Sequence, residues 1–268
     1  MISDSTRGYA PYRAALACVL LAWLWNSCSL LRWYVAMRGS ARVVDHYFPS
    51  AFAEPRYLLW AYGGPIVLGA VAFIAPARRI RILHAIALVC GSAWILLQQA
   101  THATQFANTS LWLGLWLLWY GQRHDLQEAA HRRKAAVLAQ LIIGVIFLGA
   151  AVGKWTNGYW SGAVFYDLLF AHEPYPQYVW ISDHFEPAQV KEISTWYSRA
   201  VVIGESVMAC IALAPPRIAL PTTVVMVLGM WLGATPRIFD AIGPVLGLGY
   251  AGTLIIRSLR REQPSNGR

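Results

Sequence analysis

Long apolar segments are the feature that most limits what this chain can fold into. About eight of them can be read along the sequence, and each approaches the roughly 17–25 residues that a membrane-spanning helix needs. They lie at 14–37, 57–76, 82–99, 104–121, 134–153, 196–214, 218–234 and 241–256. Because 57% of the residues are hydrophobic and only 13% are charged, one water-soluble core of this size cannot bury them all. The sequence therefore predicts an all-α integral membrane protein, a bundle of about eight transmembrane helices in contact with the lipid bilayer.

Basic residues gather in alternate connections between these segments. The clusters are Arg78, Arg79 and Arg81; Arg123, Arg132, Arg133 and Lys134; and Arg257, Arg260 and Arg261. Cytoplasmic loops carry the excess of Lys and Arg, so this pattern predicts a multi-pass protein of a bacterial inner membrane with both termini in the cytoplasm. The formal net charge of +9 then reflects topology, and no nucleic-acid partner is expected.

The expected domain organisation is simple. Residues 1–256 are expected to form one transmembrane domain, and 257–268 a polar cytoplasmic tail. The one sizeable connection, 155–195, falls on the outer side and mixes carboxylates with many aromatic residues. Such a mixture is typical of an extracytoplasmic loop or lid at the membrane interface, where Trp and Tyr side chains anchor. Within it we expect a short amphipathic helix at about 162–171, and the next transmembrane helix from about Trp196.

Lys154 is the first candidate functional residue, because it stands where a long apolar helix reaches the outer membrane surface. A cation there loses part of its hydration. Partial burial disfavours the ammonium form, so such a lysine can be neutral and accept a proton as a general base. The alternative is structural: lysines at helix ends also extend toward the interface and complement the negative end of the helix dipole.

Glu205 is the second candidate, because a carboxylate inside an apolar helix should face a partner or a cavity rather than lipid. Catalysis is one interpretation. A structural ion pair, for example with Arg32 near the outer end of the first helix, is at least as consistent with the sequence.

A polar band connects the third and fourth apolar segments on the outer side. It contains Gln98, Gln99, His102, Thr104, Gln105 and Asn108. These side chains either line a cavity that opens toward Lys154 or join neighbouring helices through hydrogen bonds. The four cysteines lack the spacing of a metal site, so no metal is expected. No phosphate-binding loop, dinucleotide fingerprint or nucleophile elbow is present, so ATP-binding, dinucleotide-binding and hydrolase functions lack support.

The segment 149–165, GAAVGKWTNGYWSGAVF, resembles the HTTM (horizontally transferred transmembrane) family, which is related to vitamin K-dependent gamma-carboxylase. The resemblance rests on Lys154 at the end of an apolar helix, followed by Trp160, Gly162 and Phe165. Two weaker similarities extend it. The run NTSLWLGLWLLW at 108–119 resembles the helix before the lysine helix of the family, and Glu205 followed by Pro215, Pro216 and Arg217 resembles a later helix and its turn.

The resemblance implies a general-base role for Lys154, because the matching lysine of the carboxylase deprotonates reduced vitamin K. A quinone is accordingly the implied ligand, although the sequence does not identify a cofactor. This chain also departs from the family: the carboxylase carries a functional histidine in the segment matching 108–119, where Asn108, Thr109 and Ser110 stand here. The large luminal substrate-binding region of the carboxylase has no counterpart after the last helix. Protein gamma-carboxylation is therefore not expected.

Three functions follow as hypotheses. The leading one is an enzyme, or an enzyme component, that acts on a lipophilic, quinone-like molecule in an outward-facing pocket around Lys154. The alternatives are a non-catalytic membrane subunit that assembles with partner proteins through its aromatic outer segment, and a carrier of a small lipophilic solute. For the leading hypothesis the catalytic residues are Lys154 and Glu205, and the ligand-binding residues are Trp160, Gly162, His102, Gln105, Asn108 and Gln98.

Overall fold

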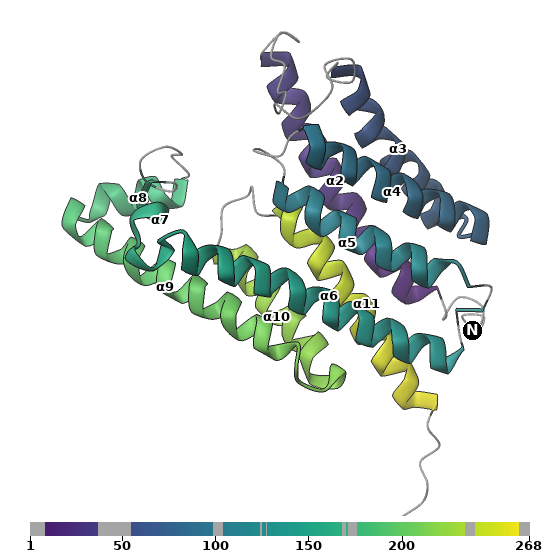
Figure 1. Ribbon diagram of the computed structural model, residues 1–268. Helices are drawn as coiled ribbons and strands as arrows, with labels where there is room; N and C mark the ends of the chain where they lie inside the picture. Colours follow the sequence, from purple (N-terminus) through teal and green to yellow (C-terminus); the bar gives the residue numbers. More distant parts are fainter. Residues whose placement is uncertain are drawn as a thin grey trace, which may run out of the picture. The chain divides into compact units, whose positions relative to one another are not determined.

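The structure is a computed structural model, and all of its regular secondary structure in the described residues is helical (Figure 1). It describes residues 9–36, 55–98, 104–123, 125–126, 128–167, 170, 176–233 and 239–262. The helices are α2 (Ala10–Ala36), α3 (Pro55–Ile74), α4 (Arg78–Gln98), α5 (Thr104–Gly121), α6 (Ala129–Thr156), the short 3-10 helix η2 (Tyr159–Ser161), α7 (Ala163–Tyr166), α8 (Pro176–His184), α9 (Pro187–Ile211), α10 (Pro216–Gly233) and α11 (Phe239–Glu262).

Every apolar segment expected to be helical coincides with a helix: α2 to α6 and α9 to α11. The largest difference is the start of α9, which begins at Pro187 rather than near Trp196. Local chemistry explains the earlier start. Glu186 and Gln189 form a capping box in which the Gln189 side chain accepts a hydrogen bond from the Glu186 backbone N–H at 2.9 Å. Pro187 follows at the first helical position, where its fixed φ suits a helix.

Three helical stretches in the described part of the chain are long and apolar enough to cross a membrane. They are Arg78–Leu97, Ala129–Thr156 and Ala241–Glu262. Shorter apolar stretches lie in α3 and α10, at Leu59–Ile74 and Pro216–Met230. These lengths indicate association with a membrane. The count of about eight spans and the orientation of the termini stay predictions.

Contacts within the chain group it into two compact units, residues 1–140 with 216–268 and residues 141–215. In the first unit α11 packs against α2, α5 and α10, and α4 packs against α3 and α5. Its interior contains large aromatic side chains such as Trp23 and Trp116. Both of these indole N–H groups have hydrogen-bond partners: Trp23 Nε1 donates to Ser110 Oγ at 3.1 Å, and Trp116 Nε1 donates to the Ala135 carbonyl at 2.9 Å.

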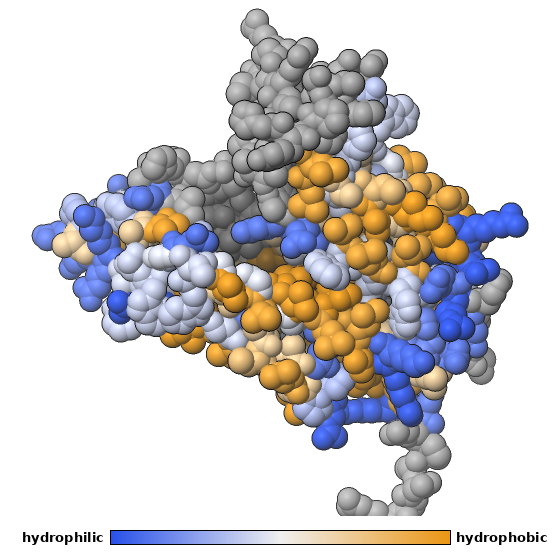
Figure 2. Space-filling view, in the orientation of Figure 1, coloured by the Kyte–Doolittle hydropathy of each residue, from blue (hydrophilic) through white to orange (hydrophobic). Residues whose placement is uncertain are grey.

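The exposed side chains of α3 and α4, in contrast, are mainly apolar. Figure 2 shows predominantly hydrophobic (orange) side chains over these two helices. Ile74 is 79% exposed and Trp60 is 77% exposed, and Leu59, Leu83 and Leu97 are also exposed. A water-soluble protein rarely leaves such a continuous apolar surface uncovered. The surface of this unit therefore suits contact with lipid tails.

Two arginines connect helix ends in the first unit through hydrogen bonds and an ion pair. Arg81 is buried and donates to the backbone carbonyls of Gly121 at 3.1 Å and Arg123 at 2.9 Å, so it satisfies groups that the end of α5 leaves unpaired. Arg132 donates to Ser258 Oγ at 2.9 Å and forms an ion pair with Glu262. These bonds explain why α11 continues through Glu262, into the segment expected to be a polar tail.

The second unit contains the end of α6 together with η2, α7, α8 and α9. The segment expected to be an outer loop or lid, 155–195, is thus largely helical. The expected helix at about 162–171 begins as α7; Asp167 and Phe170 are also helical, of the π type, and 168, 169 and 171 lie outside the described residues. Phe165 of α7 and Tyr178 of α8 form a small buried core, and Tyr159, Phe170, Ile181, Tyr197 and Val201 pack against it. We call these seven residues the aromatic cluster. α9, which runs beneath α7 and α8 in Figure 1, contributes Tyr197 and Val201 to it.

Candidate functional site

The last part of α6 and the second half of α9 lie side by side in opposite directions. A Cβ atom on Gly144 would overlap with Ala212, so these two positions are in close contact near one end of the pair. Near the other end, Trp155 Nε1 donates to Ser206 Oγ at 3.1 Å. The small residue at 144 allows the helix backbones to approach, and the approach brings Lys154 to Glu205.

Lys154 and Glu205 form an ion pair. Lys154 Nζ donates to Glu205 Oε1 at 2.8 Å, and their side chains are 17% and 8% exposed respectively. The carboxylate lies on the buried face of α9, between the buried Val202 and Met208. The sequence predicted a partner for Glu205 and named Arg32 as an example. The partner in the structure is Lys154, while the Arg32 side chain lies outside the described residues.

One oxygen of the carboxylate remains unused. Glu205 Oε2 is buried and has no hydrogen-bond partner among the described groups. A buried acceptor without a donor costs free energy, typically about 1–3 kcal/mol and more for a charged group. The ammonium of Lys154 has three N–H groups, and one of them is directed to Oε1. The pair therefore offers a free acceptor beside free donors, which is the combination that binds a hydroxyl group.

Tyr159 borders the pair. Lys154 Nζ lies 5.5 Å from the centre of the Tyr159 ring, a cation–π contact. Burial, and secondarily the Glu205 carboxylate, raise the pKa of the Tyr159 phenol, so its hydroxyl keeps its proton. The ring also meets Phe165 edge to face at 5.3 Å. Tyr159 thus joins the ion pair to the aromatic cluster, a role that its sequence position did not reveal.

Three hydroxyl groups of α9 hold the segment after α6 in place. Ser194 Oγ donates to the Gly162 carbonyl at 3.0 Å, Thr195 Oγ1 donates to the Ser161 carbonyl at 3.2 Å, and Ser198 Oγ donates to the Tyr159 carbonyl. We call these three residues the hydroxyl ladder. They fix the backbone that carries Tyr159 and so the contact of Tyr159 with Lys154.

Gly162 is required by this arrangement. Its φ is +80°, a left-handed conformation that other residues rarely adopt. A Cβ atom at this position would lie 2.5 Å from Thr195 Cα. The glycine that the sequence singled out as ligand-binding therefore has a clear backbone role: it lets the chain turn directly against α9.

Trp160 belongs to a stack on the outside of the second unit. Its ring stacks on Trp155 at 4.9 Å, and the Arg199 guanidinium lies 5.2 Å from the Trp160 ring centre and 5.6 Å from that of Trp196. The Arg199 Nε also donates to the Trp160 carbonyl at 3.3 Å. We call Trp155, Trp160, Trp196 and Arg199 the tryptophan stack.

The residues of the polar band are not brought to the ion pair by any described contact. Gln105 and Asn108 are exposed on α5, in the first unit. The Gln98 side chain and His102 lie outside the described residues. Thr109 and Ser110, in the segment matching that of the carboxylase histidine, are both engaged: Thr109 bonds the Gln105 carbonyl at 2.9 Å, and Ser110 accepts from Trp23. A cavity lined by the polar band stays a prediction.

Comparisons with known proteins add no relative. No family model matches the chain, and neither a curated protein nor a solved structure shows significant similarity to it. The likeness to the HTTM family therefore rests on the sequence similarities described above alone, at 149–165, at 108–119 and around Glu205.

Proposed function

We propose that this protein is a membrane-embedded enzyme, or the catalytic component of one, that removes a proton from a hydroxyl group of a lipophilic, quinol-like molecule. The observation that carries the proposal is the buried ion pair of Lys154 with Glu205, in which Oε2 has no partner. Buried side-chain polar atoms normally have a hydrogen-bond partner, and an exception calls for an explanation, of which a catalytic role is one. A ligand hydroxyl would provide the missing donor.

Lys154 acts as the base in this proposal. As an ammonium it has no lone pair, so it must first give up a proton. Transfer of that proton from Nζ to Glu205 Oε1, along the 2.8 Å hydrogen bond, converts the ion pair into a neutral amine and a neutral acid. The quinol hydroxyl, which binds by donating to Glu205 Oε2, then redirects its proton to the amine, and the new ammonium stabilises the quinolate oxygen.

Aromatic side chains suit a flat, apolar ring near this pair. Tyr159 contacts Lys154, and Trp155 follows Lys154 directly in the chain and stacks on Trp160. Ligand sites for such molecules are mainly apolar and aromatic, with a few polar groups that fix orientation.

Absorbance spectroscopy of a bound quinol tests whether Lys154 acts as the base. A short-chain naphthoquinol is added to the protein in lipid nanodiscs, and the absorbance of the quinolate is recorded. Wild type should generate bound quinolate at a pH where the free quinol is protonated. A Lys154→Met/Glu205→Leu variant, which removes both charges, should give none. Lys191→Met is the matched control, since this exposed α9 lysine faces the Tyr166 ring and has no ion pair in the described structure. Equal quinolate signals in all three proteins would refute the proposal.

The second candidate is a non-catalytic subunit, and the exposed aromatics of α8 and α9 favour it. Trp180 is 56% exposed, Trp196 is 63% exposed and Phe185 is 39% exposed. Large exposed aromatic side chains are typical of protein interfaces as well as of membrane interfaces. In this case Trp180→Ala should release a stoichiometric partner protein from the purified complex, and removal of the Lys154 and Glu205 charges should not.

A further inference from the structure

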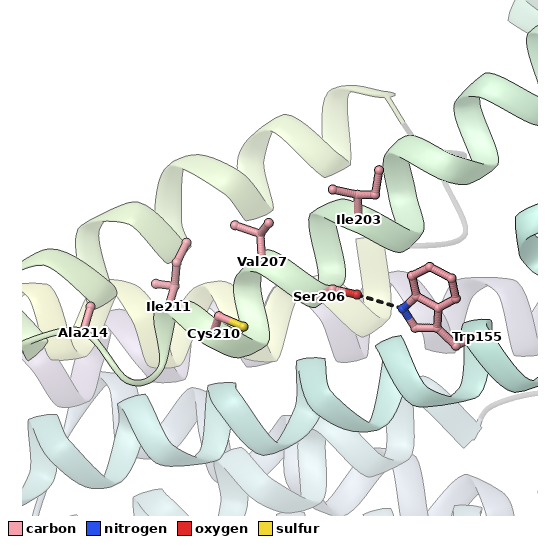
Figure 3. Close-up of a pocket in the computed structure, with 7 residues that line it drawn as sticks. All are labelled: Trp155, Ile203, Ser206, Val207, Cys210, Ile211 and Ala214. Atoms are coloured by element: carbon pink, nitrogen blue, oxygen red, sulfur yellow. Dashed lines mark hydrogen bonds between the residues drawn. The ribbon is translucent and has the colours of Figure 1, made fainter.

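A groove runs along α9 in the second unit (Figure 3). It has a volume of about 440 Å³ and is lined by Trp155, Ile203, Ser206, Val207, Cys210, Ile211 and Ala214. Its one hydroxyl is already occupied, because Ser206 Oγ accepts from Trp155 Nε1 at 3.1 Å and donates to the Val202 carbonyl at 2.8 Å. The groove therefore offers a ligand apolar contact and no free hydrogen-bonding side chain.

This groove is separate from the ion pair. Ile203 and Val207 each stand two positions from Glu205, which corresponds to a rotation of about 200° around a helix with 3.6 residues per turn. Glu205 lies on the buried face of α9, whereas Ile203 is 50% exposed and Val207 is 46% exposed. A ligand in the groove would consequently leave the Lys154–Glu205 pair in place.

A cation lies one turn before the groove on the same side of α9. Arg199 precedes Ile203 by four residues, the spacing of neighbours on one helix face. Its guanidinium is held against Trp160 and Trp196, and its Nε bonds the Trp160 carbonyl. It forms no ion pair with any described carboxylate. The two terminal amino groups of the planar guanidinium are therefore available, and their N–H groups match the spacing of two phosphate oxygens.

We propose that this face of α9 binds one anionic phospholipid of the surrounding bilayer, with the phosphate on Arg199 and one acyl chain in the groove. From Arg199 to the end of α9 at Ile211 the helix rises by about 18 Å, enough to follow much of a lipid chain. The order of residues along α9 agrees with a bilayer: Trp196 and Arg199, near the middle of the helix, precede the apolar residues that line the groove, and the charge pattern of the sequence predicts that the N-terminal end of this helix faces outward. The inference depends on the chain lying in a membrane and not on the chemistry at Lys154.

Lipid retention tests this site. The protein is reconstituted in nanodiscs that contain phosphatidylcholine in excess over phosphatidylglycerol, released into mild detergent and weighed by native mass spectrometry. Wild type should retain one phosphatidylglycerol. Arg199→Gln should reduce the retention of phosphatidylglycerol by about tenfold, the effect of losing one charge-assisted contact. Arg199→Lys should retain less of this lipid than wild type but more than Arg199→Gln. Val207→Trp should expel the lipid by filling the groove.

Matched controls separate this site from general lipid contact. Lys191→Gln removes a cation two turns earlier on α9, and Leu213→Trp adds a tryptophan at an exposed position that does not line the groove. Both should retain phosphatidylglycerol as wild type does, as should the variant without the Lys154 and Glu205 charges. The proposal is overturned if wild type retains the two lipids in bilayer proportion, or if the control variants lose phosphatidylglycerol as Arg199→Gln does. Circular dichroism confirms that each variant is folded.

Discussion

At the scale of single residues, the structure joins two side chains that stand 51 positions apart in the sequence. Each could be singled out from its own surroundings, since both are charged groups in apolar helices. Their pairing could not be predicted, because it depends on how closely α6 and α9 approach, which small residues such as Gly144 decide. The unused oxygen of Glu205 likewise becomes visible only when every neighbouring donor is placed.

Removing one partner of this pair should destabilise the protein. In Lys154→Met the Glu205 carboxylate is left buried and unpaired, and we expect the free energy of unfolding to fall by about 2–4 kcal/mol, somewhat less than for a fully buried pair. Lys154→Met/Glu205→Leu should recover most of this loss, because no charge remains to be solvated. Denaturant unfolding of wild type, the single variant and the double variant in the same detergent measures these differences in the free energy of unfolding. A double variant no more stable than the single one would contradict this account of the pair.

Two glycines with positive φ provide a matched test of the turn after α6. Gly162→Ala combines the left-handed conformation with the clash against Thr195, and we expect a loss of more than about 2 kcal/mol. Gly158→Ala has a similar φ of +72° but nothing within 4 Å of its Cβ, so only the conformational cost of about 1 kcal/mol applies. Thermal unfolding compares the two. Equal losses would show that Gly162 does not need its close approach to α9.

At the scale of elements, the sequence predicted the eight long helices well, because their apolar runs are unambiguous. For the segment between α6 and α9 it predicted one short helix, at about 162–171, and did not predict η2 or α8. Aromatic composition placed this segment at an interface but could not show that it folds into η2, α7 and α8 against α9. The hydroxyl ladder holds η2 and Gly162 against α9, and the sequence does not show which carbonyls Ser194, Thr195 and Ser198 face.

Loss of the hydroxyl ladder should therefore loosen this segment selectively. In Ser194→Ala/Ser198→Ala two backbone carbonyls lose their donors, at about 1 kcal/mol each. Amide hydrogen exchange should become faster in 157–166 and stay unchanged in α11. Thr253→Ala serves as the control, because its hydroxyl bonds only the Gly249 carbonyl of its own helix at 2.8 Å. Faster exchange throughout the chain would mean that the ladder stabilises the whole fold rather than this segment.

At the scale of the whole molecule, the long apolar helices and the exposed apolar surface of α3 and α4 indicate a membrane protein. Orientation rests on the charge pattern of the sequence, and labelling can test it. In a background without the native cysteines, Asp183→Cys should react with a membrane-impermeant maleimide added to intact cells, and Arg261→Cys should react only after the cells are opened. The reverse pattern would place the Lys154 end of the protein on the cytoplasmic side.

Native mass spectrometry of the protein, gently extracted from its own membrane, tests the central claim most directly. We expect wild type to retain a small lipophilic molecule that carries a hydroxyl or quinone oxygen. Lys154→Met/Glu205→Leu, which removes both charges at the site, should lose this molecule, and Lys191→Met should keep it. A stoichiometric protein partner with no small molecule, unchanged in all three proteins, would contradict a ligand site at Lys154 and Glu205 and favour the non-catalytic subunit.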